Sequence, residues 1–229
     1  MGQMVQFRAN GSSAEGYLAV PVSGHGPGLI VIQEWWGLVD HIKQVCDRFA
    51  ESGFVALAPD HYHGQQTKSP DDAGKLFMAL NIAQAGQELR GAAEYLLALE
   101  AVEPKRVGAL GFCMGGQLAL FAAAEHGDRI ACAVDFYGIH PNVKIDPTRL
   151  KVPVLGHFGT RDHSVPAEGV RQLAAAVGTA GGSFEPHFYE ADHAFFNDTR
   201  PQAYNQAAAA LAWRRTLEFL GKYLGPGKS

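Results

Sequence analysis

Three side chains, spread along the chain in one order, could together carry out nucleophilic catalysis. Cys113 lies in residues 111–116 (GFCMGG), Asp162 follows a strand-like run, and His193 follows the last such run. A histidine can take the proton of a thiol and later protonate a leaving group. A carboxylate behind the histidine orients the ring and stabilises its charged form. The sequence therefore predicts a Cys-His-Asp triad.

The residues around Cys113 have the pattern of a sharp turn between a strand and a helix. An apolar run, 106–110, precedes the motif, and a run of good helix formers, 117–124, follows it. Strand, Gly-x-nucleophile-x-Gly, helix is the pattern of the nucleophile elbow of α/β-hydrolases, here with cysteine in the usual serine position. Glycines are expected because side chains two residues from the nucleophile would collide with it. The following helix N-terminus would favour a thiolate and a developing oxyanion.

Other residues compete for the histidine and acid roles. Asp192 directly precedes His193 but is expected to point elsewhere, and His157 lies inside a strand pattern, which predicts a core position. His163 adjoins Asp162 and stays open as a neighbour of the site. The order nucleophile, acid, histidine is that of α/β-hydrolases, and it favours Asp162 and His193.

A further carboxylate and an oxyanion hole are predicted at the end of the apolar run 28–33. Glu34 follows this run, and ligands bind at the carboxyl ends of strands in α/β sheets. The alternative for Glu34 is a surface carboxylate at a helix N-terminus. The backbone N–H groups of Met114 and Trp35 are the expected oxyanion-hole donors.

Strand-like and helical patterns alternate from residue 28 onward. Strands are predicted at 28–33, 54–59, 106–110, 129–138, 151–159 and 183–189, and helices at 39–52, 69–80, 83–99, 117–124, 165–178 and 202–223. The runs 4–9 and 16–21 predict an N-terminal hairpin. We therefore expect one α/β domain over residues 1–229, with a mostly parallel central sheet of about eight strands, helices on both faces and an antiparallel edge.

The composition gives no indication of a nucleic-acid-binding, secreted or membrane protein. The 229 residues are 47% hydrophobic and 18% charged, with a net charge of −4, which gives no sign of nucleic-acid binding. Neither a signal sequence nor a membrane span is recognisable, so a cytoplasmic protein is expected. Of the three cysteines, Cys46 and Cys132 fall in apolar patterns and are expected in the core. The pair His61-x-His63 has metal-ligand spacing, but no further ligands stand near it, so no metal is expected.

Five stretches resemble the dienelactone hydrolase family, also called carboxymethylenebutenolidases, and together they are specific for it. The resemblance covers nearly the whole length, and the stretches are 33–37 (QEWWG), 58–62 (APDHY), 111–116 (GFCMGG), 159–162 (GTRD) and 192–195 (DHAF).

The resemblance implies the α/β-hydrolase fold and a triad of Cys113, His193 and Asp162. It also implies that Glu34 accepts the thiol proton when substrate binding rearranges the pocket, so that the thiolate forms only when needed. That gating would protect the thiol from oxidation. The implied reaction is cleavage of a small ester or lactone, such as the conversion of carboxymethylenebutenolide to maleylacetate, through an acyl-thioester. No metal or organic cofactor is implied.

One departure concerns the substrate. Family members that hydrolyse dienelactone bind its carboxylate with arginines, one of which comes shortly after the histidine, where this sequence has residues 194–197 (AFFN). The region 69–80 offers only Lys75, and Arg200 could reach in from the following loop or be a surface charge. The pocket is expected to be aromatic and largely apolar, with Trp36, Tyr62, Phe195 and Asn197 as candidate lining residues.

Two other functions remain open at this point. One is a broad carboxylesterase or thioesterase that uses the same residues, and the other is a non-catalytic hydrolase-fold protein that binds a small ligand. The expected partner is a small ester or lactone, and the expected assembly is a monomer or small homo-oligomer.

Overall fold

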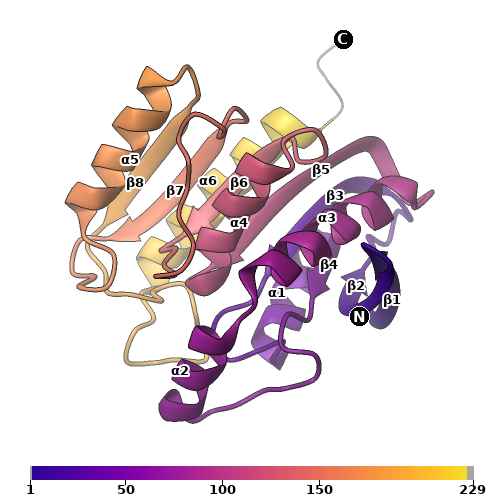
Figure 1. The fold of residues 1–229 in the computed structure, drawn as a ribbon, viewed down its shortest axis with the longest axis horizontal. Helices are drawn as coiled ribbons and strands as arrows, with labels where there is room; N and C mark the ends of the chain where they lie inside the picture. The colour runs from indigo at the N-terminus through magenta and orange to yellow at the C-terminus, as the bar shows by residue number, and fades with distance from the viewer. Residues whose placement is uncertain (1, 226–229) are drawn as a thin grey trace.

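Eight strands form one sheet in the computed structural model, which describes residues 2–225 (Figure 1). Their order is β1-β2-β4-β3-β5-β6-β7-β8. The two N-terminal strands pair antiparallel, and the strands from β4 through β3 to β8 are parallel. This confirms the predicted sheet and its antiparallel edge. The strands are β1 (Gln3–Ala9), β2 (Ser12–Ala19), β3 (Gly26–Ile32), β4 (Val55–Pro59), β5 (Val102–Phe112), β6 (Cys132–Phe136), β7 (Val154–Gly159) and β8 (Phe184–Tyr189).

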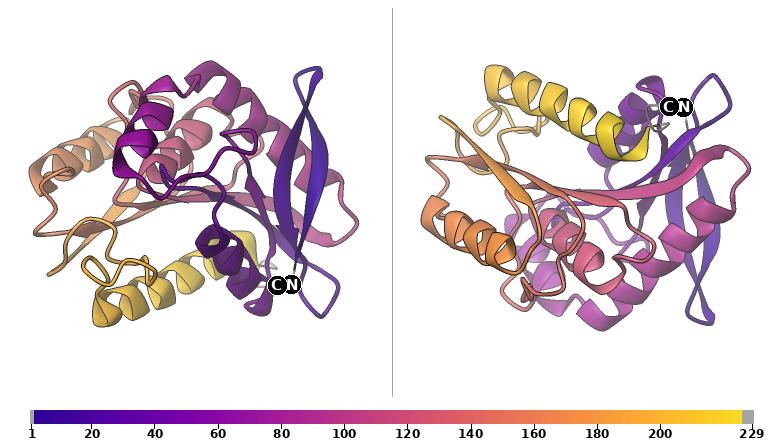
Figure 2. Two further views of the ribbon diagram at one scale, coloured as in Figure 1. Left: turned by 90° about the horizontal axis from the view of Figure 1, so that it is seen from below. Right: turned by 90° about the horizontal axis from the view of Figure 1, so that it is seen from above.

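Helices cover both faces of this sheet, as predicted (Figure 2). They are α1 (Asp40–Glu51), α2 (Pro70–Ala79), α3 (Ile82–Ala98), α4 (Met114–Glu125), α5 (Ala167–Thr179) and α6 (Gln206–Leu224). α1 and α6 lie on one face, and α3, α4 and α5 lie on the other. Alternate side chains of β3 serve the two cores, because successive residues of a strand point to opposite faces. Leu29 and Val31 pack on the α1 and α6 side, and Ile30 and Ile32 on the other.

Several element boundaries differ from the prediction by a few residues, among them the start of β2, which begins at Ser12 and not at residue 16. Two of the differences have clear local reasons. α6 begins at Gln206 rather than near residue 202, because the Asn205 side chain accepts a hydrogen bond from the Ala208 N–H and caps the helix there. β5 extends from Val102 to Phe112, beyond the predicted 106–110, because its start pairs with β3 at Gly26.

The parallel strands place their carboxyl ends at one edge of the sheet. The loops after β3, β5, β6, β7 and β8 therefore meet there, and each carries a residue of the site described next. No helix within residues 2–225 is long and apolar enough to cross a membrane.

Candidate active site

Cys113 lies at a strained turn between β5 and α4. Its φ of 52° and ψ of −119° are unusual for a residue with a side chain. A Cβ at Gly111 would lie 2.0 Å from the Gly115 carbonyl oxygen, and a Cβ at Gly115 would lie 2.3 Å from the carbonyl oxygen of Ile32. The glycines are therefore needed for the turn, as predicted, but the clash they avoid is with backbone and not with the nucleophile.

The structure brings Cys113, His193 and Asp162 together from three different strand ends. The His193 Nδ1 lies 2.6 Å from Asp162 Oδ2, and the Asp162 side chain is fully buried. The other carboxylate oxygen, Oδ1, accepts hydrogen bonds from the N–H groups of Ser164 and Val165, which fix the carboxylate. Cys113 and His193 line the same cavity.

Opposing effects act on the His193 ring. Burial disfavours its charged form, but hydrogen bonds to Asp162 and Cys113 outweigh burial and raise the pKa of His193 to about 10. The raised pKa favours the imidazolium form of the ring, which lines the same cavity as Cys113.

Glu34 is a buried carboxylate on the wall of the same cavity. Its Oε2 accepts a hydrogen bond of 2.6 Å from the Asn197 amide, and its Oε1 is buried without a hydrogen-bond partner in the described chain. Burial raises the pKa of Glu34, and His41 and Asn197 partly oppose that shift. The surface alternative for this residue is wrong, because only 2% of Glu34 is exposed.

The two backbone N–H groups predicted for an oxyanion hole belong to the residues that directly follow Cys113 and Glu34. Met114 is the first residue of α4, and Trp35 follows Glu34 after β3. Neither N–H donates a hydrogen bond to another backbone group within residues 2–225. Their role as oxyanion-hole donors stays a prediction.

Tyr137 belongs to this site, although no motif in the sequence indicated it. Its ring is fully buried and packs edge-on against His193, with the ring centroids 5.1 Å apart. Cys113, Tyr137 and Ala194 all have positive φ, at 52°, 43° and 62°. Strained backbone of this kind gathers at functional sites. The available signal was the position of Tyr137 directly after β6, at the carboxyl edge of the sheet.

The cavity lined by Cys113 and His193 has a volume of about 740 Å³ and a largely apolar wall. Trp36 lines it, as predicted, and so do several residues that the sequence did not indicate: Phe77, Ile139, His140 and Val165. α2 reaches the cavity through Phe77. The centroids of the Phe77 and His140 rings lie 4.4 Å apart, and the Phe77 carbonyl oxygen lies 3.1 Å from His140 Nε2.

Three predicted lining residues lie elsewhere. Tyr62 is buried, and its hydroxyl donates to the sulfur of Met114, the first residue of α4, so it contacts that helix instead of lining the cavity. Phe195 is fully buried in the core against Tyr137 and Tyr189, because the chain turns inward after His193. Asn197 does not line this cavity either, and its amide is used by Glu34.

Of the two cationic side chains considered for binding a substrate carboxylate, one lines the cavity and the other does not. Lys75 is exposed and forms an ion pair with Asp72 at 2.8 Å on α2, away from the cavity. Arg200 is half-buried and lines the cavity, and its Cζ lies 4.3 Å from the centroid of the Trp36 ring.

The competing residues have other roles. His157 is fully buried, between the hydroxyl groups of Tyr189 at 2.8 Å and Thr216 at 3.0 Å, which confirms its core position. Asp192 is half-exposed and pairs with Arg161 at 3.3 Å, and His163 is exposed and does not line the cavity.

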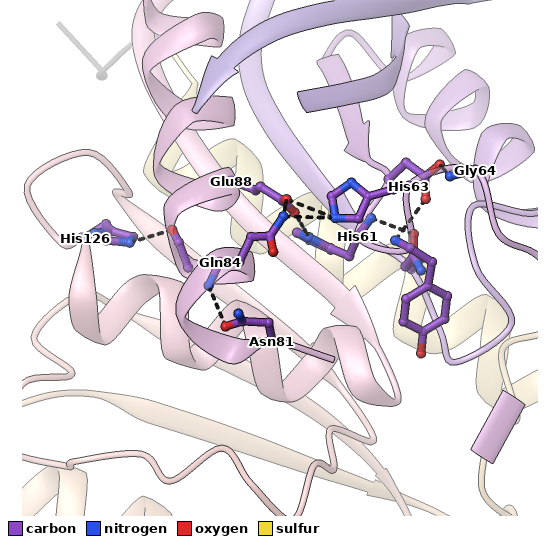
Figure 3. Close-up of polar contacts among 11 residues, drawn as sticks. His61, His63, Gly64, Asn81, Gln84, Glu88 and His126 are labelled. Atoms are coloured by element: carbon purple, nitrogen blue, oxygen red, sulfur yellow. Dashed lines mark hydrogen bonds and ion pairs between the residues drawn. The ribbon is translucent and has the colours of Figure 1, made fainter. Parts of the chain in front are cut away.

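His61 and His63 both turn toward Glu88 of α3 (Figure 3). His61 Nδ1 lies 2.9 Å from Glu88 Oε2, and His63 Nε2 lies 3.4 Å from Glu88 Oε1. Gln84 donates to Glu88 Oε1 as well, at 3.1 Å. This is a hydrogen-bonded network, and within the described residues no three His, Cys, Asp or Glu side chains are arranged to hold a metal ion.

Known proteins resemble this chain along most of its length. Residues 14–224 match the dienelactone hydrolase family. "Protein usf" of Aquifex pyrophilus is 39% identical over 231 residues, which cover 98% of this chain and 100% of the relative. The carboxymethylenebutenolidase of Pseudomonas sp. strain P51 is 34% identical over 213 residues, which cover 89% of this chain and 88% of the relative.

A solved structure gives the same result for the fold. The dienelactone hydrolase-like promiscuous phosphotriesterase from metagenomic libraries superposes with a TM-score of 0.87 at 24% identity, over 98% of this chain and 99% of that chain. With the family match, the near-complete coverage of its relatives and the order of strands in its sheet, the chain belongs to the dienelactone hydrolase family and is a hydrolase with the α/β-hydrolase fold.

Proposed function

We propose that the protein cleaves a small ester or lactone by covalent catalysis at Cys113, with His193 and Asp162 as its partners. The observation that carries the proposal is the 2.6 Å contact between His193 and the buried Asp162, in the same cavity as the strained Cys113. A cysteine, a histidine and a buried acid gathered in this way support acyl transfer as the reaction.

The charge on His193 defines the first step. The imidazolium stabilises a thiolate at Cys113, and the thiolate sulfur attacks the carbonyl carbon of the substrate. The resulting oxyanion would accept hydrogen bonds from the N–H groups of Trp35 and Met114. His193 then protonates the leaving alkoxide as the acyl-thioester forms, and a water molecule whose proton goes to His193 releases the acid.

Glu34 is proposed to exchange the thiol proton with Cys113. A buried carboxylate with a raised pKa is a stronger base when ionised than an exposed one, and its Oε1 has no other partner in residues 2–225. Asn197 holds the other oxygen and thereby keeps the group on the cavity wall.

The proposed substrate class is a dienelactone-type lactone or a related ester with a carboxylate. Arg200 supports this, because a half-buried guanidinium on the cavity wall is a carboxylate partner. A small-molecule partner, the absence of a metal or organic cofactor, and a cytoplasmic location stay predictions from the sequence.

Steady-state hydrolysis of cis- and trans-dienelactone beside p-nitrophenyl acetate tests the proposal. We expect Cys113→Ala to abolish turnover, and mass spectrometry of the wild type after brief exposure to the ester to detect an acyl adduct on Cys113. Cys46→Ala, which removes a buried thiol outside the cavity, is the matched control and should keep activity. Full activity of Cys113→Ala would overturn the proposal, and a ligand bound without turnover or adduct would indicate a binding protein.

A further inference from the structure

α2 forms part of the wall of the Cys113 cavity, but little of it is buried. Of its ten residues, all within the described chain, only Ala73 is buried, whereas buried residues recur along α3 from Ala85 to Leu96. In Figure 1, α2 lies at the lower margin of the molecule. Phe77 is the residue through which α2 lines the cavity. The shape of the cavity on this side therefore depends on what holds α2 in place.

One hydrogen bond joins α2 to the loop after β6. His140 in that loop donates from Nε2 to the carbonyl oxygen of Phe77, at 3.1 Å. Within residues 2–225, it is the only hydrogen bond between α2 and a residue outside the segment 69–80. The two rings also pack together, with their centroids 4.4 Å apart. A single side chain thus holds α2 from across the chain.

The partners of the His140 ring require its neutral form in one tautomer. A carbonyl oxygen can only accept, so Nε2 carries the proton that is donated to Phe77. Nδ1 accepts the backbone N–H of Asn142 at 3.1 Å, so it carries no proton. A proton on Nδ1 would face that N–H and break the bond that orients the ring.

Charge on the His140 ring would therefore weaken its hold on α2. Burial lowers the pKa of His140, the Phe77 carbonyl partly opposes this, and no charged side chain contributes to the shift. A ring released into solvent regains its ordinary pKa of about 6.5, so the held position is weakened as the pH falls below that value. The titratable groups around the ring are Glu34, Cys113, His193 and Arg200 on the cavity wall, the exposed Asp71, Asp72 and Lys75 of α2, and the exposed Lys144 and Asp146 after β6.

The position of Phe77 decides how the cavity is bounded on the side of α2. Its ring meets that of Trp35 edge-on, with the centroids 6.4 Å apart, and both residues line the cavity. The wall is largely apolar, so it selects a substrate by size and apolar contact. Movement of α2 would widen the apolar part of this wall and leave Cys113 in place.

We propose that His140 is a positioning residue that holds α2 on the Cys113 cavity and thereby sets the size of the acyl group that the enzyme accepts. This inference rests on the proposed function and deepens it toward the substrate class. Short acyl groups are preferred while His140 holds Phe77 on the wall, and longer ones are admitted when α2 is released.

The kcat/KM values for p-nitrophenyl acetate, butyrate and octanoate measure this size limit. His140→Ala removes both hydrogen bonds and should raise the ratio of octanoate to acetate by about tenfold. The change should lie in KM more than in kcat, because the substitution leaves the contact between His193 and Asp162 intact. His140→Gln should keep the ratio within about twofold of the wild-type value, because its amide can donate to the Phe77 carbonyl oxygen.

Hydrogen exchange of the α2 amides reports on the helix itself, which a residue that only lines the cavity would not affect. His140→Ala should raise exchange in α2 relative to α6 by about fivefold or more, and His140→Gln should not. In the wild type, the same ratio should rise from pH 7 to pH 5. In His140→Gln it should stay constant, because an amide does not titrate in this range.

His126→Ala is the matched control. His126 Nε2 also donates to a helix carbonyl, that of Gly86 in α3, at 2.9 Å, but His126 does not line the cavity (Figure 3). This variant should leave both the ester ratio and the exchange of α2 at their wild-type values.

The outcomes separate this inference from the proposed function. A raised ester ratio with faster α2 exchange in His140→Ala, both reversed in His140→Gln, supports the inference, and no change in either quantity overturns it. If His140→Ala does not fold, equal changes of α2 exchange between pH 7 and pH 5 in the wild type and His140→Gln overturn it. If no ester is hydrolysed, the proposed function fails, and exchange in the same variants still decides whether His140 holds α2.

Discussion

At the scale of single residues, the charge on His193 depends on one contact with a buried carboxylate. The contact is 2.6 Å long, and it is the largest influence that raises the pKa of His193 to about 10. The imidazolium exists below that pKa, so activity that needs it should fall as the pH rises toward 10. Asp162→Asn should lower kcat/KM by about a hundredfold or more, and should move the alkaline limb of the pH profile to lower pH. An alkaline limb that stays in place in this variant would exclude the pairing as its cause.

Asn197 offers a second prediction at this scale, because its amide faces the buried Glu34 at 2.6 Å. Asn197→Ala removes that hydrogen bond and should cost about 1–3 kcal/mol of unfolding free energy at any pH between 5 and 8. Asn197→Asp places a second carboxylate beside Glu34, and two such groups cannot both ionise without repulsion. Its melting temperature should therefore fall further below that of Asn197→Ala at pH 8 than at pH 5. Equal losses at both pH values would argue against a carboxylate at Glu34.

The sequence predicted the positions of site residues that lie at the ends of strands, but it did not predict which aromatic residues line the cavity. Cys113, Asp162 and His193 directly follow or lie in recognisable motifs, so their approach to one another could be predicted. Tyr62 and Phe195 could not be placed, because an aromatic residue beside a motif can face the cavity or the core. The inward turn of the chain after His193 places Phe195 in the core, and the contact with Met114 of α4 holds Tyr62 away from the cavity. Neither feature can be recognised in the sequence.

At the scale of elements, the elbow between β5 and α4 depends on close backbone contacts. Gly111→Ala would place a Cβ 2.0 Å from the Gly115 carbonyl oxygen. This overlap can be relieved only if β5 or α4 moves. We expect a loss of about 3 kcal/mol or more in unfolding free energy, together with lower activity. Gly74→Ala in α2 is the control, because its Cβ would meet nothing within 4 Å and the substitution favours the helix. Chemical denaturation of both variants checks the contrast.

The elements themselves were well predicted from periodicity and turn residues. Each predicted strand and helix exists, and their alternation led to the correct sheet. The start of α6 was four residues early, since alanines at 203 and 207–210 favour a helix whichever residue caps it. Asn205 makes the capping hydrogen bond, and the residues before it form turns that sequence periodicity does not reveal.

At the scale of the whole molecule, stability is coupled to pH through a buried carboxyl group next to the site. Asp135 at the end of β6 is 2% exposed and accepts a hydrogen bond from the Gly138 N–H at 2.7 Å. Burial raises its pKa to about 7, against the opposing effects of that hydrogen bond and of His193. Between about pH 4 and 7 the folded protein holds a proton that the unfolded chain has released, so unfolding free energy falls as the pH rises through this window.

Asp135→Asn removes the titration but keeps the acceptor for Gly138. The variant should gain stability relative to the wild type as the pH is raised from 5 to 8, which thermal unfolding at several pH values can measure. Glu51→Gln, on the exposed end of α1, removes a charge without burial and should follow the wild type throughout. A constant difference between Asp135→Asn and the wild type over this range would contradict the assignment.

The distribution of the thiols has a practical consequence for work on the native protein. Cys46 and Cys132 are fully buried, and burial raises the pKa of Cys132 to about 12 and that of Cys46 as well, so both stay protonated and shielded. Cys113 alone among the three free cysteines opens into a cavity. A thiol-specific reagent should therefore label one cysteine per chain, Cys113. Substrate that occupies the cavity should slow this labelling, so that occupancy can be followed in the native protein without a substitution.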